Sequence, residues 1–91
     1  MSKPPTVGRV VVYTLSGLDV YAIQQRRNAT GCEGNSVYEG MSFPALVVRS
    51  DGGVHINLRV FLDGDDIYWA CSRVEGKPGE PGCWAWPVRE G

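Results

Sequence analysis

Neither sign of charge predominates in this chain, and that absence excludes several classes of partner. Its 9 Lys and Arg residues stand against 10 Asp and Glu residues, which leaves a formal net charge of −1 at pH 7. Nothing global therefore attracts the protein to a phosphate backbone or an anionic membrane surface. The longest apolar runs, such as residues 45–48, are far shorter than the roughly 20 residues that a membrane-spanning helix needs. We therefore expect no membrane association and no general nucleic-acid binding.

Metal ligands and activated nucleophiles are also scarce. The three cysteines, Cys32, Cys71 and Cys83, form no C-x-x-C pair, and His55 is the single histidine. An odd number of widely spaced cysteines favours reduced thiols, with one disulfide as the alternative. Structural metal sites usually take ligands in close pairs, and no serine or cysteine nucleophile lies near His55 in the sequence. The sequence therefore predicts a protein that is not an enzyme and that has no metal or cofactor.

The clearest pattern in the chain is the alternation at residues 54–62, around which we expect the fold to form. Every second side chain there is aliphatic: Val54, Ile56, Leu58, Val60 and Leu62. This period of two is typical of a strand with one buried face. An Asp-Gly turn at residues 63–66 then leads into a returning strand at residues 67–73.

A helix and three more strands complete the predicted order. The strands are expected where β-branched and aromatic residues gather, at residues 8–15, 43–49 and 83–86. Ser16 and Asp19 have the spacing of a capping box, which predicts a helix over residues 17–28. Its inward-facing residues are expected at the spacing i, i+3, i+4: Leu18, Tyr21 and Ala22.

These elements predict a single domain over residues 1–91 that is mainly β with one helix (α+β). Five short strands around a small core fit a five-stranded SH3-like barrel, with the helix after the first strand covering an open end. A strongly bent antiparallel sheet packed against the helix is the alternative. We expect a flexible lead-in at residues 1–7, an exposed Pro/Gly loop at residues 74–82, and Trp69 and Trp86 in the core.

Several strings in the chain carry a resemblance to a known group of proteins. They are VGRVVVYTLSG near the start, FPALVVR, VHINLRVFLDGDDIYWACSR and PGCWAWPVR. Together they resemble small accessory proteins of actinobacterial phages and prophages, over residues 7–89, with FLDG-x-D-x-YWA and WAWP as the most specific parts. The resemblance implies a phage-encoded protein that acts in the host cytoplasm. Because the group has no established activity, it implies no catalytic residue.

The candidate binding residues lie on the outward side of the central alternation. An exposed aromatic ring there needs a reason, and arginine pairs readily with anions. The residues expected on this outer face are Phe61, Arg59, His55 and Tyr68. Arg26 and Arg27 would join them in an anion site if the helix brings them close, although cations at a helix end are explained by the helix dipole alone.

Three functions follow from these residues. The favoured one is a non-enzymatic binding module that engages a host protein, or a second copy of itself, through the aromatic and arginine face. The first alternative is a sponge that sequesters a small nucleotide, such as a host defence signal, by stacking and by arginine contacts. The second alternative is a minor virion or assembly protein. No secretion signal is visible at the start of the sequence, which also favours the cytoplasm.

Overall fold

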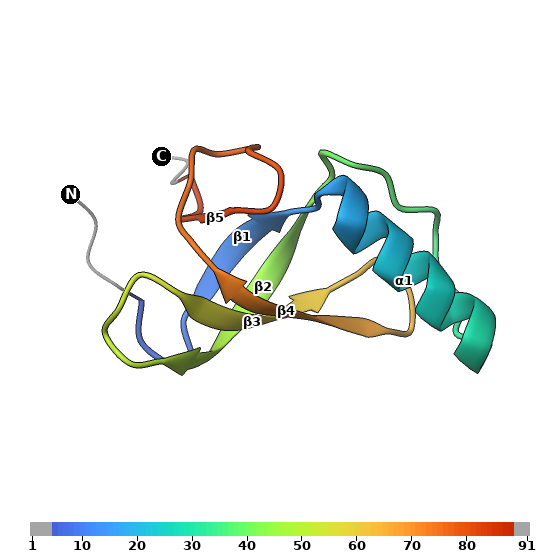
Figure 1. The fold of residues 1–91 in the computed structure, drawn as a ribbon, viewed down its shortest axis with the longest axis horizontal. Helices are drawn as coiled ribbons and strands as arrows, with labels where there is room; N and C mark the ends of the chain where they lie inside the picture. Colours follow the sequence, from blue (N-terminus) through green and yellow to red (C-terminus); the bar gives the residue numbers. More distant parts are fainter. Residues whose placement is uncertain (1–4, 89–91) are drawn as a thin grey trace.

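The computed structural model describes residues 5–88, so most of the lead-in expected at residues 1–7 lies outside the described part of the chain. The fold is mainly β with one helix after the first strand, as the sequence predicts (Figure 1). The elements, in chain order, are β1 (Val10–Thr14), α1 (Gly17–Thr30), β2 (Ser42–Ser50), β3 (Ile56–Phe61), β4 (Ile67–Arg73) and β5 (Trp84–Ala85). Residues 77–82 contain neither helix nor strand.

The five strands form one sheet in the order β4-β3-β2-β1-β5, and all neighbouring strands are antiparallel. The sheet does not close into a barrel, so the open, bent sheet is the correct alternative. A short parallel bridge between Glu75 and Trp84 links the chain after β4 to β5, where the Gly76 N–H donates to the Trp84 carbonyl at 2.9 Å. Because β5 has two residues, it is too short to extend this pairing and close the sheet into a barrel.

The core lies on one face of the bent sheet, and α1, which crosses one end of the sheet beside the turn from β3 to β4, adds Ile23 to it (Figure 1). The alternation in β3 is as expected, since Ile56, Leu58 and Val60 are buried while Arg59 and Phe61 are exposed. Their neighbours across the sheet supply most of the remaining core: Val11, Tyr13, Phe43, Ala45, Val47 and Ala70. Val54 is exposed and precedes the strand, so β3 begins two residues later than the alternation suggests.

The face of α1 that meets the sheet differs from the prediction. Leu18 is 83% exposed and Tyr21 is 62% exposed, whereas Asp19 and Ile23 are buried. Ala22 is exposed as well. Asp19 causes this rotation, because its carboxylate is bound both by the helix cap and by side chains of the sheet. The helix therefore buries the row i, i+4 that starts at Asp19 instead of the more apolar row that starts at Leu18.

The prediction that Trp69 lies in the core is also wrong, because its side chain on β4 is 56% exposed. Residues paired directly across antiparallel strands lie on the same face of the sheet. Ala70 pairs with buried Leu58, and Tyr68 pairs with buried Val60, so the residue between them points outward. Another tryptophan, Trp84, fills the core instead.

Trp86 is half-buried and packs against the edge of the core. Its ring meets the ring of Trp84 edge-on at a centroid distance of 5.7 Å. The guanidinium of Arg9 lies over the Trp86 ring, 5.3 Å from its centroid, in cation–π geometry. The expectation of a core role for Trp86 thus holds only in part.

Candidate functional site

The face of the sheet that points away from α1 carries large apolar side chains in contact with solvent. We call this set the outer-face patch, and it comprises Val10, Leu46, Arg59, Phe61, Ile67 and Trp69. The most exposed of the apolar members are Trp69 and Val10, at 56% and 51%, and Phe61 and Ile67 follow at 42% and 36%. Exposed apolar side chains that lie next to one another on a surface are a common mark of an interaction site.

The strand register brings these residues together from four strands. Val10 pairs with Leu46, Leu46 pairs with Arg59, and Arg59 pairs with Trp69, which makes one row across β1, β2, β3 and β4. Phe61 pairs with Ile67 in the next row on the same face. Two of the predicted site residues, Phe61 and Arg59, therefore lie where they were expected, and Trp69 joins them.

Arg59 stands inside this apolar patch without a counter-charge. Among residues 5–88, no carboxylate forms an ion pair with Arg59, and its guanidinium makes no side-chain hydrogen bond. Leu46 and Trp69 are its neighbours on the two adjoining strands. The patch thus presents a cation and aromatic surface side by side, the composition that protein interfaces favour at their centres.

His55 is on the same side of the sheet but in a separate place. It precedes β3 and lines a small pocket with Arg49, Asp51, Asn57 and Ser72. Within the described chain no hydrogen bond links His55 to Ser72 or Asp51, so the pocket has no assembled catalytic triad.

Tyr68 was expected on the outer face, but the structure places it on the opposite one. Its hydroxyl donates to Oδ1 of Asp19 at 2.7 Å, and the Arg73 guanidinium donates to the same oxygen at 2.8 Å. Tyr13 donates to Oδ2 of Asp19, as does the backbone N–H of Ser16. Tyr68 therefore belongs to a buried network that joins the helix to the sheet.

Burial and the neighbouring carboxylate change the acidity of this network. Burial, reinforced by the hydrogen bond to Asp19, raises the pKa of Tyr68 to about 12 and raises the pKa of Tyr13 further. Burial alone would also raise the pKa of Asp19, but hydrogen bonds from Ser16, Tyr13 and Tyr68 outweigh it and lower that pKa. The network therefore holds an ionised carboxylate between two neutral phenols, which is a structural arrangement with every oxygen of Asp19 engaged.

Arg26 and Arg27 fasten the end of α1 to the turn between β3 and β4. Arg27 donates from Nε and Nη2 to the two carboxylate oxygens of Asp66, at 2.8 and 3.0 Å. This bidentate pair lowers the pKa of Asp66 and raises that of Arg27. Arg26 donates from Nη1 to the carbonyl of Ile67 at 2.9 Å. Both arginines thus serve internal contacts, and they do not join Arg59 in one site.

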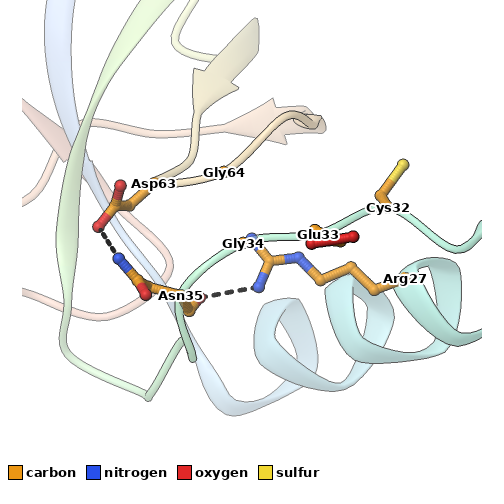
Figure 2. A pocket seen from close by; sticks show the side chains of 7 residues that line it. All are labelled: Arg27, Cys32, Glu33, Gly34, Asn35, Asp63 and Gly64. Atoms are coloured by element: carbon orange, nitrogen blue, oxygen red, sulfur yellow. Dashed lines mark hydrogen bonds between the residues drawn. The ribbon is translucent and has the colours of Figure 1, made fainter.

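A wider groove lies beside Arg27, between the segment that follows α1 and the turn after β3 (Figure 2). Its volume is about 520 Å³, and its lining consists of Arg27, Cys32, Glu33, Gly34, Asn35, Asp63 and Gly64. Polar groups that line it bind one another: Arg27 donates to the Asn35 carbonyl, and the Asn35 amide donates to Asp63, each at 2.8 Å (Figure 2). In the described part of the chain, no cluster of His, Cys, Asp or Glu is suited to holding a metal ion.

The three cysteines are free thiols in this structure. Among the described residues, no helix has the length and apolar character needed to cross a membrane. In comparisons with known proteins, no family model, no curated protein and no solved structure matched the chain. The geometry of the outer-face patch is therefore the basis for a functional hypothesis.

Proposed function

We propose that this chain is a non-enzymatic binding protein that docks another protein on its outer-face patch. The observation that carries the proposal is the exposure of Trp69, Phe61 and Ile67 around Arg59 on a sheet whose other face is already covered. Burial of such rings and aliphatic groups against a partner removes apolar area from water, at roughly 25 cal/mol per Å². Tryptophan and arginine also dominate the binding energy of many interfaces.

The position of Arg59 argues for a foreign partner over a second copy of the chain. In a twofold-symmetric dimer, a residue near the centre of the interface meets the same residue of the other copy. Arg59 occupies an inner position in the row from Val10 to Trp69, so a dimer centred on it would bring two guanidinium groups together. A partner that presents a carboxylate among apolar groups would complement the patch in both charge and shape.

The sequence resemblance to phage and prophage proteins of actinobacteria supports a host protein as this partner, met in the host cytoplasm. A nucleotide sponge has less support, because Tyr68, Arg26 and Arg27 are engaged in contacts within the chain. No particular feature of the patch favours a virion component.

The proposal is tested by affinity capture from an actinobacterial lysate, followed by binding measurements with the purified partner. Trp69→Ser and Phe61→Ser remove rings from the patch, and Tyr21→Ser is the matched control because Tyr21 is a 62% exposed ring on α1. We expect the wild-type and control proteins to retain one partner that both patch variants lose. With the purified partner, Trp69→Ser should weaken binding about 30-fold or more, as for an interface hot spot.

Arg59→Gln gives a second, independent measurement. It should weaken binding and reduce the dependence of the association rate on salt, because the proposed carboxylate contact is electrostatic. Equal retention of the partner by all variants would place the interface elsewhere. Light scattering that shows a dimer lost on Trp69→Ser would instead make the patch a self-association surface.

A further inference from the structure

A small polar pocket lies at the end of the sheet's outer face, beyond the outer-face patch. It has a volume of about 160 Å³, and the residues that line it are Arg49, Asp51, His55, Asn57 and Ser72. Arg49 pairs with Asn57 across β2 and β3, so the two side chains share one face of the sheet. Asn57 lies two residues before Arg59 on β3, which makes the pocket continuous with the patch.

An irregularity in β4 shapes this pocket. Leu58 pairs with Ala70 and Ile56 pairs with Arg73, so the partner strand has an extra residue opposite Asn57. Ser72, in this bulge, has a φ of 58°, the left-handed region that normally favours glycine. Its N–H donates to Oδ1 of Asn57 at 2.8 Å. This hydrogen bond fixes the Asn57 amide so that its NH₂ group remains available to the pocket.

The pocket contains more hydrogen-bond donors than acceptors. Within residues 5–88, the guanidinium of Arg49, the imidazole of His55 and the NH₂ group of Asn57 have no acceptor. The Ser72 hydroxyl has only a weak contact of 3.8 Å with the Cys71 thiol. The single carboxylate, Asp51, already accepts from the Gly53 N–H at 3.0 Å through one of its oxygens. Converging donors of this kind, one of them a permanent cation, are suited to an oxyanion.

We infer that this pocket binds a small oxyanion, a carboxylate or a phosphate. Arg49 supplies the charge and a bidentate fork, while His55, Asn57 and the Ser72 hydroxyl donate around the remaining oxygens. The volume admits one such group. The inference does not depend on the proposed function, although a partner docked on the outer-face patch could supply the anion from its own side chain.

The test is a titration of the ¹⁵N-labelled protein followed by NMR. Sodium phosphate and sodium acetate are added in separate series, and sodium chloride of matched ionic strength serves as the reference. We expect saturable shifts of the Asn57 side-chain amide and of the Ser72 backbone amide, with a dissociation constant on the order of 1 mM. Saturation by phosphate alone, by acetate alone or by both supports the site and identifies which oxyanion it prefers.

Variants separate this pocket from general charge effects. Arg49→Gln and His55→Gln should each weaken oxyanion binding, by about tenfold for Arg49, while Arg59→Gln should weaken it less, because Arg59 does not line the pocket. Shifts that follow ionic strength without saturating, or that persist unchanged in both pocket variants, would overturn the inference. Because the experiment measures binding of an added ion, its outcome does not depend on whether a protein partner is found.

Discussion

Both carboxylate oxygens of Asp19 are engaged by donors from several parts of the chain. Oδ2 accepts from Tyr13 and from the Ser16 backbone, and Oδ1 accepts from Tyr68 and Arg73. One buried side chain thus caps the helix, positions it on the sheet and neutralises an arginine. A charged residue at this position is costly to remove because its partners stay behind.

Asp19→Asn should therefore destabilise the fold strongly. The substitution keeps the size of the side chain but leaves Arg73, whose side chain is 27% exposed, without its carboxylate. We expect a loss of about 2–4 kcal/mol in the free energy of unfolding, measured by urea denaturation. Tyr68→Phe, which removes one hydrogen bond to the same carboxylate and a long 3.4 Å hydrogen bond from Arg73, should cost about 1 kcal/mol. Equal effects of the two substitutions would contradict this ranking.

A substitution at Ser72 is expected to stabilise the fold, unlike the two above. Its φ of 58° is strained for a residue with a Cβ atom and unstrained for glycine. The left-handed backbone costs an ordinary residue roughly 1–2 kcal/mol, part of which glycine loses to its greater unfolded-state entropy. Ser72→Gly should therefore raise the thermal midpoint slightly, whereas the β-branched Ser72→Val should lower it. A lower midpoint for the glycine variant would show that the Ser72 hydroxyl contributes more to stability than the removal of backbone strain.

Secondary structure was predictable at the scale of elements because its local signals are strong. The capping box at Ser16 and Asp19, the aliphatic alternation of β3 and the turn residues between strands each act over a few residues. The rotation of α1 was not predictable in the same way. Hydrophobicity favours Leu18 as the inward residue, and only the distant partners of Asp19 reverse that preference.

The faces of β4 show a second limit of sequence reasoning. Both of its faces contain apolar residues, so the pattern alone does not select the buried one. The register with β3 decides it by pairing Tyr68 with Val60 and Ala70 with Leu58. For the same reason the sequence correctly placed Phe61 and Arg59 on the exposed face of the sheet but assigned Trp69 to the core and Tyr68 to the surface.

The corrected rotation of α1 can be tested by matched truncations. Ile23→Ala removes a side chain that is 1% exposed in the core, and it should cost about 2–4 kcal/mol of the free energy of unfolding. Leu18→Ala removes an exposed side chain from the same helix, and its effect should stay within about 0.5 kcal/mol. Chemical denaturation of both variants decides the question. A larger loss of stability for Leu18→Ala would show instead that Leu18 lies on the buried face of the helix.

The contact between the segment after α1 and the turn after β3 depends on glycine. A Cβ atom on Gly64 would lie 2.6 Å from the Gly34 Cα and 2.7 Å from the Glu33 carbonyl oxygen. Because both neighbours are backbone, the segment would have to move away. We expect Gly64→Ala to cost about 1–3 kcal/mol, as overpacking does.

Amide hydrogen exchange locates this effect. The Asn35 N–H donates to the Asp63 carbonyl at 2.8 Å, and the Asp65 N–H donates to the Glu33 carbonyl at 2.9 Å. Both amides should exchange faster in Gly64→Ala. Gly17→Ala is the control, because an added Cβ there meets only the flexible Glu39 side chain. Unchanged protection of both amides in the Gly64 variant would refute the close approach.

At the scale of the whole molecule, two carboxylates connect stability to acidity. The pKa of Asp19 is lowered because its hydrogen bonds outweigh burial, and the pKa of Asp66 is lowered chiefly by the hydrogen bond from Arg27. Both groups bind a proton less readily in the folded chain than in the unfolded one. Their contribution is therefore complete above the unfolded carboxyl pKa of roughly 4 and is lost as the pH falls through their lower folded values.

The expected result is a free energy of unfolding that changes little between about pH 7 and pH 5 and declines below about pH 4. Urea denaturation across this range measures it. Asp66→Asn should reduce stability at neutral pH and make the decline in acid shallower, because one of the responsible groups no longer titrates. If the free energy of unfolding of Asp66→Asn declines as steeply in acid as that of the wild type, other carboxylates cause the acid sensitivity.

The two faces of the sheet differ in what they contact. The helix, the Asp19 network and most of the core lie on one side, while the outer-face patch and the oxyanion pocket lie on the other. Mutations on the outward side should therefore leave the chain able to fold while they alter the proposed binding surface. Under selection, such a scaffold could exchange one target for another by drifting through intermediates that all remain stable.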